Sequence, residues 1–246
     1  MTKEVKKKQL EVCAFNIQSC VIAQRVGAAR VELCDNPVEG GTTPSAGTIE
    51  QVRSMIDIQL YPIIRPRSGN YFYNKEEYEI IRRDILFCKS LGCDGISVGT
   101  QKISAEIDKE WLKRIVDWAY PMKVTCNRAF DGTPDLFAAL EDLIDCGCER
   151  VLTSGGKIGA PQGGLILKRL VEQADDRIIV MPGAGINSGN LEALIAQCAA
   201  NQYHASARLI SPNPLQYVND KITDYGNLYV SSEKELNKMI QILEQH

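Results

Sequence analysis

Two short segments of the sequence place a carboxylate and a thiol two positions apart. Glu11 precedes Cys13, and Glu32 precedes Cys34, in runs that are otherwise largely apolar. Because side chains two apart on a strand share a face, each run presents an acid and a thiol on the same side, with the thiol nearer the strand end. The thiols fit either a small buried apolar role or a functional one. Glu11 and Glu32 are candidates for acid and base chemistry.

Three arginines stand at the ends of similar runs. Arg65 and Arg67 close the third apolar run, and Arg128 follows the fifth. A charge in an apolar strand is costly unless it is paired, so two interpretations remain open. In the first, Arg65 or Arg67 forms structural ion pairs with Glu11 or Glu32. In the second, the arginines hold an anion beside the two acids.

Histidine is scarce in this chain. The sequence contains two, and one of them, His246, is the last residue. This excludes a zinc site built from several histidines. His204, in the eighth apolar run, is therefore the single candidate for histidine-dependent chemistry, although a structural histidine in the core would fit the same position.

Small residues follow the last three apolar runs. Backbone amides in glycine-rich turns ahead of a helix can cradle an anion, and many barrel enzymes bind phosphate with these last loops. The candidates for such a phosphate site are Ser154, Gly155 and Gly156 after the sixth run, Gly183 and Gly185 after the seventh, and Ser206 after the eighth.

A repeating unit positions these residues. A glycine lies between a helical pattern and a short apolar run in three segments, RVGAARVELC, SLGCDGISVG and DCGCERVLTS. Gly27, Gly92 and Gly147 are therefore predicted to mark junctions from helix to strand. The predicted strands are 9–14, 30–34, 59–65, 95–99, 123–127, 150–153, 177–182 and 203–207. The predicted helices are 19–26, 48–55, 75–91, 109–119, 134–146, 164–174, 189–199 and 233–244. Thr133 and Pro134 are predicted to start the fifth helix, and a capping box of Ser232 and Glu235 is predicted to start the last.

Eight strands that alternate with eight helices, at about 31 residues per unit, predict a (β/α)8 TIM barrel in the α/β class. No break in composition divides the chain, so a single domain covers 1–246. Two segments depart from the pattern. Residues 1–8 form a basic tail, and residues 208–231, before the last helix, are too polar and turn-rich for a helix. We expect the latter to be an extended loop over one end of the barrel or a subunit contact.

Composition narrows the class of protein. There are 28 basic and 31 acidic residues, for a net charge of −3, which gives no reason to expect a nucleic-acid partner. No apolar stretch reaches the roughly 18 residues of a membrane span, and no signal peptide follows the charged start. Nine cysteines, an odd number spread through apolar runs, indicate reduced thiols. These features predict a cytoplasmic protein.

Six motifs occur in order along nearly the whole chain: VELCDNPVEGGTTPSAG, IIRPRSGNYFY, NRAFD, RVLTSGG, MPGAGI and HASAR. In these the chain resembles the CutC family. The resemblance implies a TIM barrel that assembles into a homo-oligomer, a dimer or larger, and a cytoplasmic role in copper homeostasis. It places copper on Cys13 and Cys34, which agrees with the preference of thiolates for Cu(I). The chain departs from the family pattern at Asn127, where the family has histidine.

Two functions of different classes therefore remain open. The first is copper binding by Cys13 and Cys34. The second is an enzyme that acts on a small phosphorylated or otherwise anionic molecule. In the second, Glu11, Glu32 and His204 would serve acid and base chemistry, Arg65, Arg67 and Arg128 would hold the anion, and the glycine turns with Ser206 would bind its phosphate.

Overall fold

The structure, a computed structural model, describes residues 7–219, 221 and 226–246. Most of the predicted basic tail, residues 1–6, lies outside these residues. The barrel strands are β1 (Gln9–Ala14), β2 (Arg30–Leu33), β3 (Gln59–Ile64), β4 (Gly95–Val98), β5 (Lys123–Cys126), β6 (Arg150–Thr153), β7 (Ile179–Pro182) and β8 (Gln202–Ala205). The helices are α1 (Ile17–Arg25), α2 (Ala46–Met55), α3 (Lys75–Ser90), α4 (Lys109–Ala119), α5 (Leu136–Cys146), α6 (Ala160–Ala174), α7 (Leu191–Cys198) and α8 (Glu233–Glu244).

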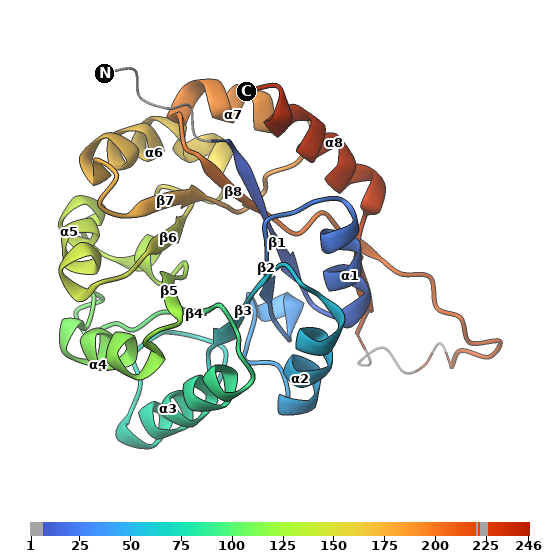
Figure 1. The fold of residues 1–246 in the computed structure, drawn as a ribbon, viewed down its shortest axis with the longest axis horizontal. Coiled ribbons are helices and arrows are strands. Elements are labelled where there is room, and N and C mark those ends of the chain that lie inside the picture. Colours follow the sequence, from blue (N-terminus) through green and yellow to red (C-terminus); the bar gives the residue numbers. More distant parts are fainter. Residues whose placement is uncertain (1–6, 220, 222–225) are drawn as a thin grey trace.

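The eight strands form one parallel sheet that curls into a barrel. Its hydrogen-bonded order runs β7-β6-β5-β4-β3-β2-β1-β8, and β7 also lies against β8, which brings the two edges together. The helices surround the strands as an outer ring (Figure 1). The predicted TIM barrel is confirmed, and most of the predicted elements agree with the observed ones to within two residues.

The glycine junctions of the repeat have the expected backbone. Gly27, Gly92 and Gly147 have φ angles of 82°, 71° and 84°, in the left-handed region that glycine adopts without a steric penalty. Each lets the chain turn from a helix directly into the next strand. The looser fourth copy differs, because Ala199, ahead of Asn201, takes the left-handed position with φ of 54°.

Two predicted helix starts need correction. Helix α5 begins at Leu136, and its cap is Asp135, whose side chain accepts from the amides of Phe137 and Ala138. Thr133 and Pro134 therefore lie before the helix rather than starting it. Ser232 does cap α8, but Glu235 completes no capping box. Its carboxylate instead accepts from the backbone and hydroxyl of Ser188, which ties α8 to the loop before α7.

The segment 208–231 contains a two-stranded ribbon at its root. Strand β9 (Arg208–Ile210) pairs antiparallel with β10 (Tyr229–Ser231). Beyond the ribbon, the described residues 211–219 extend away from the barrel past α1 and α8, and do not cover its end (Figure 1). Residues 220 and 222–225 of the predicted segment lie outside the described residues.

The interior of the barrel is unusually polar. The apolar core lies between the outer faces of the strands and the helices, where residues such as Val12, Val31 and Leu140 are fully buried. The inner faces carry buried polar side chains: Glu11, Arg30, Glu32, Ser97, Thr125, Asn127, Arg150 and His204. A barrel filled with charges must pair them, and the pairing determines the site below. Among the described residues, no helix is both long and apolar enough to cross a membrane.

The inner packing makes a prediction at Gly95, at the start of β4. A Cβ there would stand 2.7 Å from the carbonyl oxygen of Lys123 and would overlap the ring of Tyr61. We expect Gly95→Ala to lower the free energy of unfolding by about 1 to 3 kcal/mol. The control is Gly47→Ala, in the exposed first turn of α2 with no atom near the new methyl, which should leave stability within about 1 kcal/mol or raise it. Urea denaturation of both variants measures the difference, and equal stabilities would contradict this packing.

Candidate functional site

A cavity of about 550 Å³ opens where the strands end. Its lining comes from β1, β2, β3, β6 and β8 and from the loops after β2, β3, β5, β7 and β8. This volume suits a small molecule, and this end of the barrel is the usual place for ligands in the fold. Of the residues predicted from sequence, Cys13, Glu32, Arg65, Arg128, Gly185, His204 and Ser206 line it.

The two predicted thiols meet beside the floor of this cavity. The sulfurs of Cys13 and Cys34 lie 3.8 Å apart, and Cys34 Sγ lies 3.5 Å from Glu32 Oε2. One ligand atom from each of these three residues lies within 4.8 Å of the other two. The strand register produces this cluster, because Cys13 is paired with Glu32 across β1 and β2.

The loop after β2 closes over the second thiol. Cys34 follows β2 directly, and its amide donates to the carbonyl of Ala14 at 2.8 Å. Gly41, with φ of 93°, packs so closely that a Cβ there would stand 3.2 Å from Cys34 Sγ. Cys34 is therefore only 2% exposed, whereas Cys13 is 9% exposed and lines the cavity.

A buried charge chain runs beneath the thiols. His204 Nδ1 lies 2.7 Å from Glu11 Oε1, and Arg30 Nε donates to the other oxygen of Glu11. Because Nδ1 is held by Glu11, the opposite nitrogen of His204, Nε2, faces the cluster and lies 3.7 Å from Glu32 Oε2. Glu11 thus orients the imidazole and lines no part of the cavity itself. Its predicted acid and base role becomes one of positioning His204.

This chain sets the protonation of the cluster. Burial opposes the charged form of Glu11, yet the Arg30 charge and the His204 hydrogen bond hold the pKa of Glu11 well below its usual range. Burial likewise disfavours a charged His204, but hydrogen bonds to Cys13 and Glu11 keep its pKa well above the usual value. The hydrogen bond from Cys34, against the effect of burial, lowers the pKa of Cys13 to about 5. Of the two thiols, Cys13 is therefore the one that loses its proton more readily.

The pKa values of Glu32 and Cys34, by contrast, are raised. Burial and the neighbouring Cys13 charge raise the pKa of Glu32 to about 8. Burial, together with hydrogen bonding to Cys13, raises the pKa of Cys34 well above that of a free thiol. Two thiols and a carboxyl group that lie this close together can release protons when a cation binds them.

A separate polar layer closes the barrel below. The guanidinium groups of Arg30 and Arg150 both lie against the ring of Tyr61, 5.1 and 5.4 Å from its centre. Both arginines donate to Gln202 Oε1, at 2.9 and 2.8 Å. They line a second hollow of about 470 Å³ at the opposite end, and it shares no lining residue with the cavity.

Arg65 holds loops rather than acids. It donates to the carbonyl oxygens of Glu39, Gly41 and Gly69 at 2.7 to 2.8 Å, and its guanidinium lies over the ring of Tyr71. The predicted ion pair with Glu11 or Glu32 is wrong, because Glu11 is taken by Arg30 and His204. Arg65 instead ties the loop after β2 to the loop after β3.

Arg67 lies outside the cavity. It forms an ion pair with Glu77 in α3, donates to the carbonyl of Phe72 at 2.8 Å and lies over the ring of Tyr73. Its predicted place beside the anion or an acid of the strands is therefore wrong. Its charge is satisfied within the loop that leads into α3.

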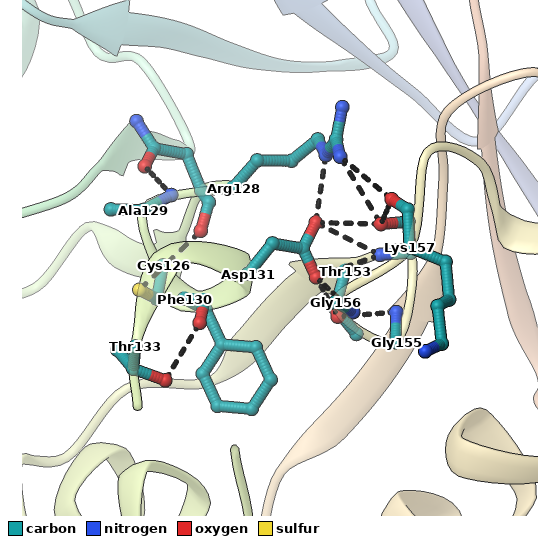
Figure 2. Close-up of polar contacts among 12 residues, drawn as sticks. Cys126, Arg128, Ala129, Phe130, Asp131, Thr133, Thr153, Gly155, Gly156 and Lys157 are labelled. Atoms are coloured by element: carbon teal, nitrogen blue, oxygen red, sulfur yellow. Dashed lines mark hydrogen bonds and ion pairs between the residues drawn. The ribbon is translucent and has the colours of Figure 1, made fainter. Parts of the chain in front are cut away.

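The glycine turn after β6 already holds an anion, the carboxylate of Asp131 (Figure 2). Asp131 accepts from the amides of Ser154 and Gly156 at 3.0 to 3.1 Å and from the hydroxyls of Thr153 and Ser154. The Gly155 amide donates to Thr153 Oγ1. The predicted phosphate cradle of Ser154, Gly155 and Gly156 is thus filled from within the chain, and none of the three lines the cavity.

Only some of the residues predicted in the turns after β7 and β8 line the cavity. Gly185 and Ser206 line the cavity, as predicted. Gly183 does not, because it packs against Leu152 and His204, where a Cβ would overlap Leu152. Because Gly183 has no side chain, His204 can pack closely against its backbone.

The family model that matches this chain is the CutC family, over residues 8–209. The chain belongs to the CutC family. A family protein CutC of Chromobacterium violaceum is 45% identical over 201 residues, 82% of this chain and 81% of the relative. The human copper homeostasis protein cutC homolog is 41% identical over 222 residues, 90% of this chain and 81% of the relative.

Solved structures agree with this assignment. CutC from Streptococcus agalactiae is 30% identical, with a TM-score of 0.78 over 81% of this chain and 98% of that one. Phosphoribosylanthranilate isomerase from Thermotoga maritima has a TM-score of 0.60 at 11% identity, over 97% of this chain and all of that one. The latter likeness supports the barrel fold alone.

Sequence reasoning missed three residues that build the site. Arg30 was interpreted only as the start of a strand. Its position in the strand next to that of Glu11 could have indicated the ion pair between them. Asp131 stands in the NRAFD motif, but its contacts 22 to 25 residues away could not be read from spacing. Arg208 lines the cavity and donates to the carbonyl of Pro37 at 2.7 Å.

The buried ion pair of Glu11 and Arg30 makes a prediction that does not depend on which ligand this CutC chain binds. Glu11→Gln leaves Arg30, which is 1% exposed, without its counter-charge. We expect a loss of about 3 to 5 kcal/mol in the free energy of unfolding. Glu79→Gln, which removes an exposed partner of Arg82 and Arg83, should change it by less than about 1 kcal/mol. Guanidinium denaturation compares the two, and a loss at Glu11 no larger than at Glu79 would refute the role of the pair.

Proposed function

We propose that this CutC family member binds Cu(I) through Cys13 and Cys34 and serves in copper homeostasis. The observation that carries the proposal is the approach of the two sulfurs to 3.8 Å at the cavity floor. Two metal–thiolate bonds of about 2.3 Å can span that separation without movement of the strands. Thiolates are the ligands that Cu(I) prefers.

The surroundings of the thiols support a cation. The pKa of Cys13 is lowered to about 5, which favours the thiolate form that a metal binds. Glu32 supplies an oxygen within 4.8 Å of both sulfurs. His204 lies beside Cys13 with Nε2 facing Glu32. The donor set is therefore compact, and its thiols are nearly shielded from solvent, which suits a metal that is easily oxidised.

The names of relatives support the same role. The human and mouse relatives, 41% and 40% identical to this chain, are called copper homeostasis protein cutC homolog. The similarity spans 90% and 87% of this chain, and the family match over residues 8–209 includes the cavity lining and both thiols.

A reducing compartment, the cytoplasm, fits the cysteine chemistry. All nine cysteines are free and buried. In an oxidising compartment, the Cys13 and Cys34 pair would be exposed to oxidation to a disulfide, which would remove both thiolates from the metal.

Copper titration tests the proposal. We expect anaerobic competition with a chromogenic Cu(I) chelator to show one tightly bound Cu(I) per chain, and Cys34→Ser to weaken binding at least tenfold, because the site loses one of its two sulfurs. The matched control is Cys126→Ser, a buried cysteine on the outer face of β5 that does not line the cavity. Binding that is absent, or equal in the two variants, would reject a copper site at these residues.

A homo-oligomer remains a prediction. The segment 208–231 supports it, because apolar side chains there stand in solvent on an extension from the barrel; these are Leu209, Ile210, Leu215, Tyr217, Val218 and Leu228. We expect light scattering to show a dimer or larger for the intact chain. Leu215→Ser combined with Tyr217→Ser should shift the mass toward the monomer with helical circular dichroism unchanged, whereas a monomeric intact chain would contradict the prediction.

A further inference from the structure

Arg128 is held at the cavity with one end of its guanidinium free. Its Nε donates to Asp131 at 2.7 Å, and its Nη2 donates to Ser154 Oγ and to the carbonyl of Lys157, at 3.1 and 3.4 Å. Nη1 has no hydrogen-bond partner among the described residues. Figure 2 shows this nitrogen pointing away from Asp131 and from the turn after β6. The side chain is 41% exposed and lines the cavity.

The neighbouring residue adds a second unused donor. Asn127 is 3% exposed and lines the same cavity. Its Oδ1 accepts from the amide of Ala129 at 3.0 Å, which identifies Nδ2 as the other end of the amide. Nδ2 is buried and has no hydrogen-bond partner. A buried donor left unpaired costs free energy, so a ligand acceptor that displaces the atoms covering Nδ2 would be favourable there.

The charge balance of the cavity favours an anion over a second cation. Arg65, Arg128 and Arg208 line it, with Arg65 Nε a further buried donor that has no partner. The carboxylates that line it are Glu32 and Glu39, and Glu39 lies on the exposed loop after β2. Arg128 and Asp131 form an ion pair with no net charge, and Asp131 does not line the cavity. Arg65 and Arg208 therefore contribute the remaining positive charge, and Nη1 of Arg128 contributes a free donor.

We propose that Arg128 and Asn127 form a binding site for the carboxylate or phosphate group of a small molecule, on the wall of the cavity opposite the thiols. Strand β5, which leads into both residues, lies four places from β1 in the barrel. The site needs no copper. The anion binds at Arg128. It does not bind in the turn after β6 that the sequence predicted, because the carboxylate of Asp131 already occupies that turn.

Asp131 is the positioning residue of this site. Its carboxylate accepts from Arg128 Nε and from the turn after β6 together, so it links the arginine to the barrel. A guanidinium held in this way loses less side-chain entropy when it binds an oxyanion. The effect of Asp131 on anion binding therefore passes through Arg128.

Calorimetry with two probes, inorganic phosphate and succinate, tests the site at constant ionic strength. We expect at least one to bind with a Kd of about 1 mM or tighter, and Arg128→Gln to weaken that binding about tenfold or more. Arg82→Gln, an exposed arginine on α3 that removes the same charge, should leave it unchanged. Preference between the probes distinguishes a phosphate from a carboxylate ligand. Saturable binding of neither ion, or equal affinities in the two variants, would overturn the proposal.

A double-mutant cycle separates positioning from general damage to the fold. Asp131→Asn should weaken anion binding in the intact chain and have no further effect in the Arg128→Gln background. Equal losses in both backgrounds would refute positioning through Arg128. Thermal unfolding checks that each variant is folded, and Asn127→Ala, a smaller change, offers a second test with the same expected direction.

The copper and anion sites can fail separately. Arg128→Gln should retain Cu(I) binding, and Cys34→Ser should retain binding of the anion. If one variant abolishes both, with the fold intact by circular dichroism, the two-site description is wrong and the cavity binds one ligand that needs both walls.

Discussion

The carboxylate of Glu11, shared between Arg30 and His204, is the interaction on which the rest of the site depends. A barrel interior normally filled by branched apolar side chains here contains charges that would be prohibitively costly alone. Glu11 neutralises Arg30 below and fixes the imidazole above. Because the imidazole is fixed, its second nitrogen faces Glu32 and Cys13, and the acidity of the whole cluster follows. Glu11 thus both neutralises a buried charge and orients His204.

The cavity has two chemically different walls. Strands β1, β2 and β8 are neighbours in the barrel and supply sulfur, carboxylate and imidazole. The loop after β5, across the barrel, supplies guanidinium and amide nitrogen. Each wall is built by residues that do not touch a ligand themselves, Glu11 on one side and Asp131 on the other. A substitution at either would therefore alter the site without removing any group from its surface.

Much of the fold, but less of the site, could be predicted from the sequence. The glycine at each junction and the alternating apolar runs are local signals, and they were enough for eight strands and the barrel. The acid and thiol pairs of β1 and β2 were also local, and side-chain alternation brought Cys13 and Cys34 together as expected. Arg65 lines the cavity, but its carbonyl partners in the loops could not be predicted, and Arg67 was misplaced because it pairs with a helix carboxylate. No periodicity marks either kind of partner. The cradle after β6 was recognised as an anion site, but its anion comes from Asp131, 23 residues before Ser154.

The layer formed by Arg30, Arg150 and Tyr61 has a kinetic consequence. It separates the cavity from the hollow at the other end, so the barrel is a blind pocket with one mouth. The thiols are nearly buried, whereas Arg128 is 41% exposed and lies nearer that mouth. If the two proposals hold together, a metal at the thiols has this cavity as its route to solvent, and an anion bound at Arg128 in the same cavity would slow its release. The residence time of the metal would then depend on the anion as well as on the sulfur bonds.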